Sequence, residues 1–270
     1  LSATAQFEKL FSQMTGARYA LAVNGCTSAL ISALVGIGVS SGDEVLVPAY
    51  TYIATASAVL AVRAIPVIVE VDQSLTMDPA DAAKKITPST RAIIPVHMRG
   101  VPSRMSEMVA LAQKHKLKVL EDCAQANGAT YRGKHVGTIG DAGAFSLKHF
   151  KMITAGEGGV VTTNDRVISE RAGCYHDSAY TFWKERDWII KPFLGENYRL
   201  SDLNGALALE QLKKRDRILS RLRAIKKQLL ETASKLPGTT LQDVPDPEGD
   251  CATSLVFFVE NPERAKAFAE

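Results

Sequence analysis

The stretch Ala92-Ile-Ile-Pro-Val96 is apolar at every position. A strand with one face in water alternates apolar and polar side chains, so this stretch predicts a strand buried on both faces, as in a sheet covered by helices. Similar strand-like runs alternate with helical patterns at 27–39, 52–62, 78–85 and 103–115. The strand-like runs are 19–24, 44–48, 66–71, 91–96, 118–121, 143–146 and 159–163. This alternation predicts an α/β fold with a mostly parallel central sheet flanked by helices.

The pattern changes near residue 201. Residues 201–236 have the spacing of one long helix, which Pro237-Gly238 ends. Strand-like runs at 239–244 and 254–259 follow it. We therefore expect a large domain over residues 1–205 and, over residues 206–270, a connecting helix and the start of a smaller C-terminal α/β domain. Because the sequence stops within a helical pattern at 261–270, we expect this smaller domain to be incomplete.

The composition excludes several classes of protein. Hydrophobic residues make up 46% and charged residues 23% of the 270 residues, which is typical of a globular protein and not of a disordered one. The net charge of +3 is too small for a nucleic-acid-binding surface. No apolar run reaches the roughly 18 residues of a membrane span, and the start does not resemble a signal peptide. The cysteines are scattered without a CxxC pair, which favours reduced thiols in the cytoplasm over a disulfide or metal site; they are Cys26, Cys123, Cys174 and Cys251.

The stretch from Phe145 to Gly159 carries the strongest chemical signal. It reads Phe-Ser-Leu-Lys-His-Phe-Lys-Met-Ile-Thr-Ala-Gly-Glu-Gly-Gly, so Ser146 ends a predicted strand, Lys151 follows five positions later, and a glycine-rich turn comes next. A lysine held in a cleft has a lowered pKa and is a nucleophile that forms Schiff bases. A surface lysine beside a turn is the alternative.

Three further segments follow predicted strands. Asn24-Gly-Cys-Thr-Ser-Ala-Leu30 starts a helix whose free N–H groups suit a phosphate, or are ordinarily capped. Glu121-Asp122 places two acids on opposite faces of a strand end, so one carboxylate can face a ligand or cap the next segment. Tyr52, in Pro48-Ala-Tyr-Thr-Tyr-Ile-Ala-Thr55, can stack on a planar ring or pack in the core.

Ligands of open α/β sheets bind beyond the carboxyl ends of the strands, where all four segments lie. Together they supply a phosphate site, a stacking ring, a carboxylate for a protonated pyridine nitrogen, and a nucleophilic lysine. These are the parts of a site for pyridoxal 5'-phosphate (PLP).

With these motifs the sequence resembles the DegT/DnrJ/StrS sugar aminotransferase family of PLP enzymes, which have the aspartate aminotransferase-like fold type I. The matching motifs are Asn24-Gly-Cys-Thr-Ser-Ala-Leu, Glu121-Asp-Cys-Ala-Gln-Ala, Ser146-x4-Lys151-x2-Thr-x-Gly-Glu-Gly-Gly and Asn197-Tyr-Arg-Leu-Ser. The resemblance implies that Lys151 forms the Schiff base with PLP, that Asp122 pairs with the pyridine nitrogen, that Gln125 contacts the phenolic oxygen and that Tyr52 stacks on the ring.

The same resemblance implies a phosphate site and a partner. Thr27 and Ser28 at the helix start, together with the Ser146 hydroxyl, hold the phosphate. Family members are homodimers with shared active sites, so Asn197 is expected to reach the phosphate in the partner subunit. The implied reaction moves an amino group from glutamate or glutamine to a keto sugar, often nucleotide-linked, or to a keto-cyclitol.

Some positions depart from the family pattern, and two other functions stay open. Cys26 stands where glycine is usual, Asn127 where histidine is common, and Arg99 where an aromatic residue is frequent. Arg99 either binds an anionic substrate group or is a surface or interface residue. A PLP-dependent sugar dehydratase, whose branch of the family has histidine in place of the lysine, and a regulatory PLP-binding protein are the alternatives. Retention of Lys151 favours transamination. The loop at 175–188, with aromatic residues that include Phe182 and Trp183, is expected to contact the acceptor.

Overall fold

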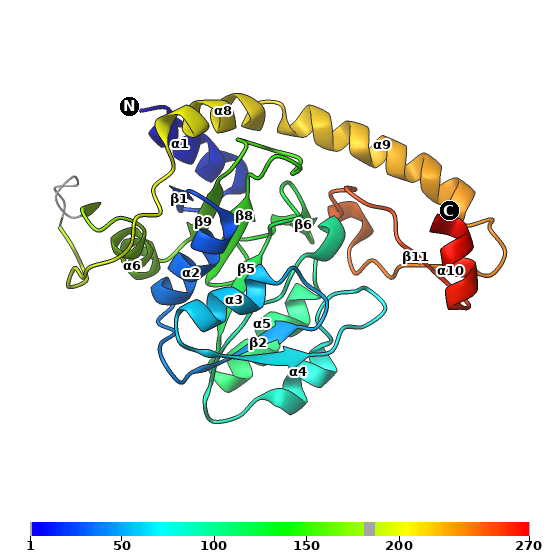
Figure 1. The fold of residues 1–270 in the computed structure, drawn as a ribbon, viewed down its shortest axis with the longest axis horizontal. Helices are drawn as coiled ribbons and strands as arrows, with labels where there is room; N and C mark the ends of the chain where they lie inside the picture. Colours follow the sequence, from blue (N-terminus) through cyan, green and yellow to red (C-terminus); the bar gives the residue numbers. More distant parts are fainter. Residues whose placement is uncertain (1, 181–186, 270) are drawn as a thin grey trace.

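The computed structural model describes residues 2–180 and 187–269 (Figure 1), so Phe182 and Trp183 of the expected acceptor loop lie outside the described residues. A seven-stranded sheet with the order β1-β9-β8-β5-β4-β2-β3 forms its centre. The strands are β1 (Tyr19–Val23), β2 (Glu44–Pro48), β3 (Ile65–Val69), β4 (Thr90–Ile93), β5 (Lys118–Asp122), β8 (Ala142–Ser146) and β9 (Gly159–Thr163). All seven predicted strands are therefore present.

The direction of the strands agrees with the predicted mostly parallel sheet. The pairs β3–β2, β2–β4, β4–β5 and β5–β8 are parallel, whereas β9 is antiparallel to both β8 and β1. β4 ends at Ile93, earlier than predicted, because Pro95 has no N–H to donate to a neighbouring strand. Val96 still forms an isolated parallel bridge to Asp122.

Helices cover both faces of this sheet. The predicted helices correspond to α2 (Cys26–Gly36), α3 (Ala54–Ala61), α4 (Pro79–Lys85) and α5 (Met105–His115). On one face α2, α3 and α6 (Arg166–His176) pack on a core that includes Val47, Leu120 and Ala144. On the other face α4 and α5 pack on Leu46, Ile93 and Val119, and α1 (Ala3–Thr15) packs near Phe145. The apolar strands are therefore buried on both sides, as their lack of alternation predicted.

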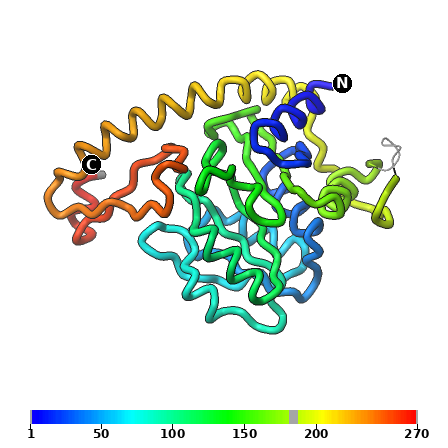
Figure 2. Tube along the Cα trace, turned by 180° about the vertical axis from the view of Figure 1, so that it is seen from behind, coloured from blue at the N-terminus to red at the C-terminus, as the bar shows by residue number. Residues whose placement is uncertain are grey.

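The single long helix predicted over 201–236 is wrong. The chain forms α8 (Asp202–Leu212) and α9 (Arg215–Ala233), separated by a turn at Lys213 and Lys214. No glycine or proline marks this turn. It is held by a tertiary contact, because the Arg215 guanidinium donates a hydrogen bond to the carbonyl oxygen of Met14, at the end of α1, over 3.3 Å. α8 packs beside α1, and α9 then runs on past the sheet domain (Figures 1 and 2).

The last residues run beside the end of α9 (Figure 2) and also contact the sheet domain, because the N–H of Arg132 donates to Asp246 Oδ2 over 2.6 Å and Cys251 is buried in the core near Phe145. They contain β10 (Thr239–Leu241), paired antiparallel with β11 (Phe257–Val259), the short 3-10 helix η2 (Pro247–Gly249) and α10 (Pro262–Ala269). Elsewhere lie the hairpin of β6 (Thr130–Tyr131) and β7 (Lys134–His135) and the 3-10 helix η1 (Met98–Gly100). Among the helices that the structure describes, none combines the length and the apolar character that crossing a membrane requires.

Candidate active site

The carboxyl ends of four strands meet at one edge of the sheet. The four are β1, β8, β5 and β2. β1 runs in the same direction as β8, because both are antiparallel to β9, and β8, β5, β4 and β2 are parallel in turn. A cavity of about 250 Å³ lies at this edge, and we call it the Lys151 cavity. Its wall includes six of the eight predicted cofactor residues, which are Thr27, Tyr52, Asp122, Gln125, Ser146 and Lys151. The other two, Ser28 and Asn197, lie outside it: Ser28 Oγ donates to Asn24 Oδ1 over 2.7 Å, and Asn197 is exposed.

The start of α2 forms one wall of the Lys151 cavity. Its N-cap residue is Gly25, and no side chain caps the helix, so ordinary capping does not occupy its first N–H groups. β9 begins against this turn: a Cβ on Gly159 would lie 2.6 Å from the carbonyl oxygen of Gly25. The N–H of Asn24 also donates to the carbonyl oxygen of Tyr198 over 2.8 Å. The turn is thus fixed from two sides, with its free donors at the cavity.

Of the two adjacent acids on β5, Glu121 points away from the Lys151 cavity and is fully buried. Its Oε1 accepts hydrogen bonds from the N–H groups of Ile139 and Gly140, both at 2.7 Å, and its Oε2 accepts one from Gly137 at 2.8 Å. His97 Nε2 lies 3.0 Å from Oε2. All strong acceptor sites of this carboxylate are therefore occupied by donors.

The ring of His97 has a defined tautomer. Its Nδ1 accepts a hydrogen bond from the N–H of Ser103 over 3.0 Å, so its hydrogen is on Nε2 and is donated to Glu121. Among the described residues, His97, Glu121 and Cys123 place possible metal-ligating atoms within 4.8 Å of one another. Because the carboxylate of Glu121 is surrounded by donors, we assign this group to the support of the strand end and not to a metal.

Asp122 is the acid that faces the Lys151 cavity. Its Oδ2 accepts a hydrogen bond from Thr55 Oγ1 over 2.8 Å, and its Oδ1 accepts one from the N–H of Ala124 over 3.0 Å. It therefore caps the following segment while its side chain lines the cavity. Burial raises the pKa of Asp122, which the two hydrogen bonds and the Lys151 cation offset only in part.

Lys151 is half-buried rather than a free surface lysine. Burial lowers the pKa of its ammonium group, while nearby Cys26 and Asp122 raise it by a smaller amount. Its Nζ lies 4.9 Å from the centre of the Phe150 ring, and the Nζ of Lys148 lies 5.2 Å from the same centre. The Phe150 ring thus contacts two cations in the wall of the cavity.

The remaining predicted residues also have specific settings. Gln125 Oε1 accepts a hydrogen bond from the N–H of Arg99 over 3.0 Å, so the NH₂ group is what this side chain offers to the cavity. Tyr52 is 65% exposed, which excludes core packing for its ring. The half-buried Cys26 lines the cavity, and burial raises the pKa of its thiol.

Sequence reasoning missed several wall residues. Thr55, which is buried behind the wall, holds Asp122 and also bonds Thr51 Oγ1 at 2.7 Å, and no role was predicted for it. Its position as a hydroxyl in the first turn of a largely apolar helix could have pointed to it. Lys148, Phe150 and Glu157 lie in or beside the lysine motif, and nothing in their spacing sets them apart.

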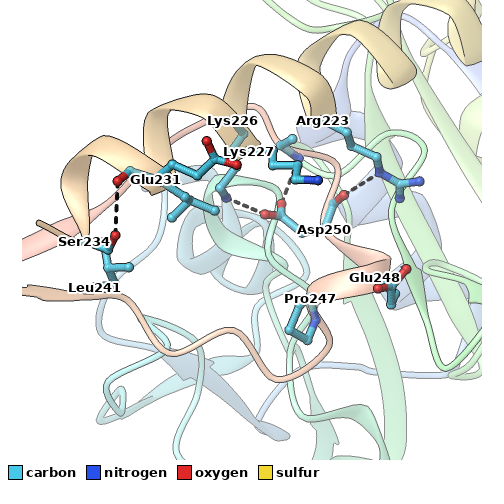
Figure 3. A pocket seen from close by; sticks show the side chains of 11 residues that line it. Arg223, Lys226, Lys227, Glu231, Ser234, Leu241, Pro247, Glu248 and Asp250 are labelled. Atoms are coloured by element: carbon cyan, nitrogen blue, oxygen red, sulfur yellow. Dashed lines mark hydrogen bonds and ion pairs between the residues drawn. The ribbon is translucent and has the colours of Figure 1, made fainter.

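A wider groove of about 670 Å³ lies between α9 and the segment that includes Leu241 and Ala252 (Figure 3). Lys226 Nζ pairs there with the carboxylate of Asp250, and Arg223 Nε donates to the carbonyl oxygen of Asp250 over 2.9 Å. None of the predicted site residues lines this groove. The convergence of the strand ends therefore makes the Lys151 cavity the candidate active site.

Comparison with known proteins agrees with this geometry. The model of the DegT/DnrJ/EryC1/StrS aminotransferase family matches residues 2–269. GDP-perosamine synthase of Caulobacter vibrioides is 41% identical over 216 residues, which are 80% of this chain and 57% of that protein. L-glutamine:2-deoxy-scyllo-inosose aminotransferase of Streptoalloteichus tenebrarius is 34% identical over 98% of this chain and 64% of its own. The chain thus spans about 57% to 64% of the length of these curated relatives.

Solved structures show the same fold. The aminotransferase from Psychrobacter cryohalolentis has a TM-score of 0.86 and 33% identity, with 96% of this chain and 70% of that chain covered. The ntda protein from Bacillus subtilis, solved with bound cofactor PMP, has a TM-score of 0.89 and 26% identity over 99% of this chain and 61% of that chain.

Proposed function

The chain belongs to the DegT/DnrJ/EryC1/StrS aminotransferase family, and on that premise we propose that it acts as a PLP-dependent aminotransferase. The proposed amino donor is glutamate or glutamine, and the proposed acceptor is a keto sugar, often nucleotide-linked, or a keto-cyclitol. The observation that carries the proposal is the Lys151 cavity, which unites a lysine, a buried carboxylate and an uncapped helix start.

The residues of the Lys151 cavity fit PLP. When bound, PLP supplies an electron sink for a carbanion at the substrate. The free N–H groups of α2, with Thr27 and the Ser146 hydroxyl, would hold its phosphate, and Ser28, whose hydroxyl donates to Asn24, would join them through its backbone N–H. Asp122 would accept a hydrogen bond from the protonated ring nitrogen, the NH₂ group of Gln125 would donate one to the phenolic oxygen, and Tyr52 would cover the ring.

Lys151 has two tasks in this proposal. Its lowered pKa leaves more of the Nζ amine neutral near pH 7 than an exposed lysine would have, and the neutral amine is the nucleophile. As a neutral amine beside the substrate, the same Nζ would take a proton from the substrate carbon and return one, as a general base and acid.

Asp122 sets the charge at the opposite end of the site. Its buried carboxylate has only two hydrogen-bond donors, so it gains from a cationic partner at the ring nitrogen. Thr55 and the N–H of Ala124 fix the direction of the carboxylate before the cofactor binds. The side chain would therefore hold a proton at that nitrogen throughout the reaction.

We also propose that the protein is a homodimer with shared active sites. Large apolar side chains are exposed next to the Lys151 cavity and on α8, among them Ile53 at 71% and Leu203 at 86%. A second copy of the chain would cover such residues. Asn197 is exposed and does not line the cavity of its own chain, which suits a role at the phosphate of the partner subunit.

Residues 1–205 would then form the cofactor domain, and residues 206–270 the connecting helices and the start of the smaller domain. The four cysteines are free thiols in the structure, which supports a reducing, cytoplasmic setting for the enzyme.

The donor half-reaction tests the proposed function. The protein is loaded with PLP, and its absorption is recorded before and after L-glutamate or L-glutamine is added. We expect the yellow absorption to disappear, with release of one keto acid per site. A yellow protein that no amino donor changes would contradict transamination, and a protein that does not take up PLP would contradict the cofactor assignment.

A further inference from the structure

A second cavity, of about 240 Å³, adjoins the Lys151 cavity, and we call it the Arg99 cavity. Lys151, Gln125, Ala124 and Phe150 line both cavities. The residues that line only the second are Arg99, Asn127, Met152, Thr253 and Ser254. A substrate whose reacting group is at Lys151 would therefore have room for a further group here.

Arg99 is held rigidly at this cavity. Its backbone has φ 57° and ψ 20°, a left-handed conformation that is uncommon for a residue with a side chain. Hydrogen bonds fix it on both sides: its N–H donates to Gln125 Oε1 over 3.0 Å, and its carbonyl oxygen accepts from Thr253 Oγ1 over 2.9 Å. Strain of this kind is kept where the surroundings impose it, and it is concentrated at functional sites.

The guanidinium group of Arg99 has donors to spare. Its Nε and Nη2 lie 3.3 and 3.2 Å from the hydroxyl of Tyr50, and no carboxylate of the described residues forms an ion pair with it. Within residues 2–180 and 187–269, no acidic residue lines the Arg99 cavity, whereas Lys151 adds a second cation to its wall. The cavity is therefore suited to an anionic group.

Asn127 gives an independent indication of a ligand. It is only 4% exposed, and neither its Oδ1 nor its Nδ2 has a hydrogen-bond partner among the residues that the structure describes. Buried amides are nearly always hydrogen-bonded, so an amide without partners in the wall of a polar cavity indicates a partner that the cavity receives. Its Nδ2 can donate to an anion, and its Oδ1 can accept from a hydroxyl or amine beside that anion.

We propose that Arg99 and Asn127 form the binding site for a carboxylate group of a substrate. The planar guanidinium matches a carboxylate in a two-pronged arrangement. This inference rests on the proposed function, because it takes a substrate to react at Lys151. The carboxylate belongs either to the amino-acid donor or to an acidic acceptor, and the experiment separates these two sources.

The test measures binding of non-reacting probes by calorimetry. Glutarate, which is glutamate without its amino group, is titrated into the PLP-loaded protein to represent the donor. D-glucuronate, compared with uncharged D-glucose, is titrated into the pyridoxamine-phosphate-loaded protein to represent an acidic acceptor. The variants are Arg99→Gln, Asn127→Leu and, as a matched control, Arg63→Gln. Arg63 is also exposed and left-handed, with φ 61°, and it lines neither cavity.

We expect Arg99→Gln to weaken one of the two carboxylate probes at least tenfold and Asn127→Leu to weaken the same probe several-fold. The PLP affinity of both variants and all binding by Arg63→Gln should stay as in the wild type. Weaker binding of glutarate by the variants would identify the amino-acid donor as the source of the carboxylate. Weaker binding of glucuronate would identify an acidic acceptor. The inference is overturned if the wild-type protein takes up PLP but binds neither probe. It is also overturned if Arg99→Gln binds both probes with the wild-type affinity. Either result leaves the proposed function standing. A wild-type protein that does not take up PLP overturns both.

Discussion

Glu121 and Asp122 are adjacent buried acids on β5, and we predict that neutralising them has opposite effects on the stability of the cofactor-free protein. Glu121 is satisfied by three backbone N–H groups and by His97. Asp122 has two donors, and its pKa is raised by burial. Glu121→Gln and Asp122→Asn each replace one oxygen by an NH₂ group and keep the shape of the side chain, so the two variants differ mainly in what surrounds them.

The cost of Glu121→Gln follows from the hydrogen bonds. An amide keeps one carbonyl oxygen, so its NH₂ group must face two of the four donors, whichever way it turns. The backbone donors cannot change. His97 cannot adapt either, because moving its hydrogen to Nδ1 would set that hydrogen against the N–H of Ser103. Two hydrogen bonds to a charged acceptor are lost, at about 1.5 to 3 kcal/mol each, so we expect a loss of about 3 to 6 kcal/mol in the free energy of unfolding.

The direction of the stability change expected for Asp122→Asn follows from the raised pKa of Asp122. Because burial raises the pKa in the folded state above the ordinary value of 3.8, the folded protein binds this proton more tightly than the unfolded chain. The contribution of Asp122 to stability is therefore fully present below pH 3.8 and is lost as the pH rises through the raised pKa. At neutral pH the asparagine variant should be at least as stable as the wild type, and this advantage should vanish in acid.

The assay is urea unfolding of the cofactor-free protein, followed by far-ultraviolet circular dichroism at one fixed protein concentration. The concentration is fixed because a dimer would make stability depend on it. The argument from hydrogen-bond donors would be refuted if the free energy of unfolding of Glu121→Gln lay within about 1 kcal/mol of the wild-type value. It would also be refuted if Asp122→Asn were destabilised as strongly as Glu121→Gln.

Three further predictions concern the Lys151 cavity. Lys151→Ala should abolish the yellow absorption that forms with PLP, whereas Lys148→Ala, in the same cavity, should retain it; equal loss in both would show that a general cationic environment matters instead. The rate of PLP capture should rise with pH around a midpoint below the ordinary lysine pKa of 10.5, and Asp122→Asn should lower that midpoint further by removing a carboxylate that raises the Lys151 pKa. Stopped-flow absorption measures this rate. An unchanged midpoint in the variant would contradict the electrostatic coupling between Asp122 and Lys151. Gly159→Ala should weaken PLP binding at least tenfold, because its Cβ would lie 2.6 Å from Gly25 and must displace the helix start; an unchanged affinity in a fluorescence titration would show that this turn does not hold the phosphate.

Much of the fold could be predicted from the sequence because local patterns determine it. Strands buried on both faces carry continuous apolar runs, and the helices between them carry their own periodicity. The break between α8 and α9 could not be predicted, since the turn at Lys213 depends on Arg215 reaching Met14, a contact between residues far apart in the chain. The helices α1 and α6 were likewise not predicted.

The site was predicted in part for a similar reason. Residues at the carboxyl ends of strands, such as Asp122 and Ser146, can be located by the rule that ligands bind at these ends. The residues that hold these strand-end side chains in place cannot be located in that way. That Glu121 is held by Gly137, Ile139 and Gly140, or that Arg99 bonds Gln125, follows from the path of loops whose sequence has no regular pattern.

The anchoring of Glu121 also has a consequence for the alignment of β5. If this strand shifted by one residue, every side chain would exchange faces, so Glu121 would enter the cavity and Asp122 the interior. The N–H groups of Gly137, Ile139 and Gly140 are matched to the carboxylate of Glu121, so the shifted alignment would leave these buried donors without it. The accuracy with which Asp122 meets a cofactor is therefore set on the opposite face of the sheet, at a place that no substrate reaches.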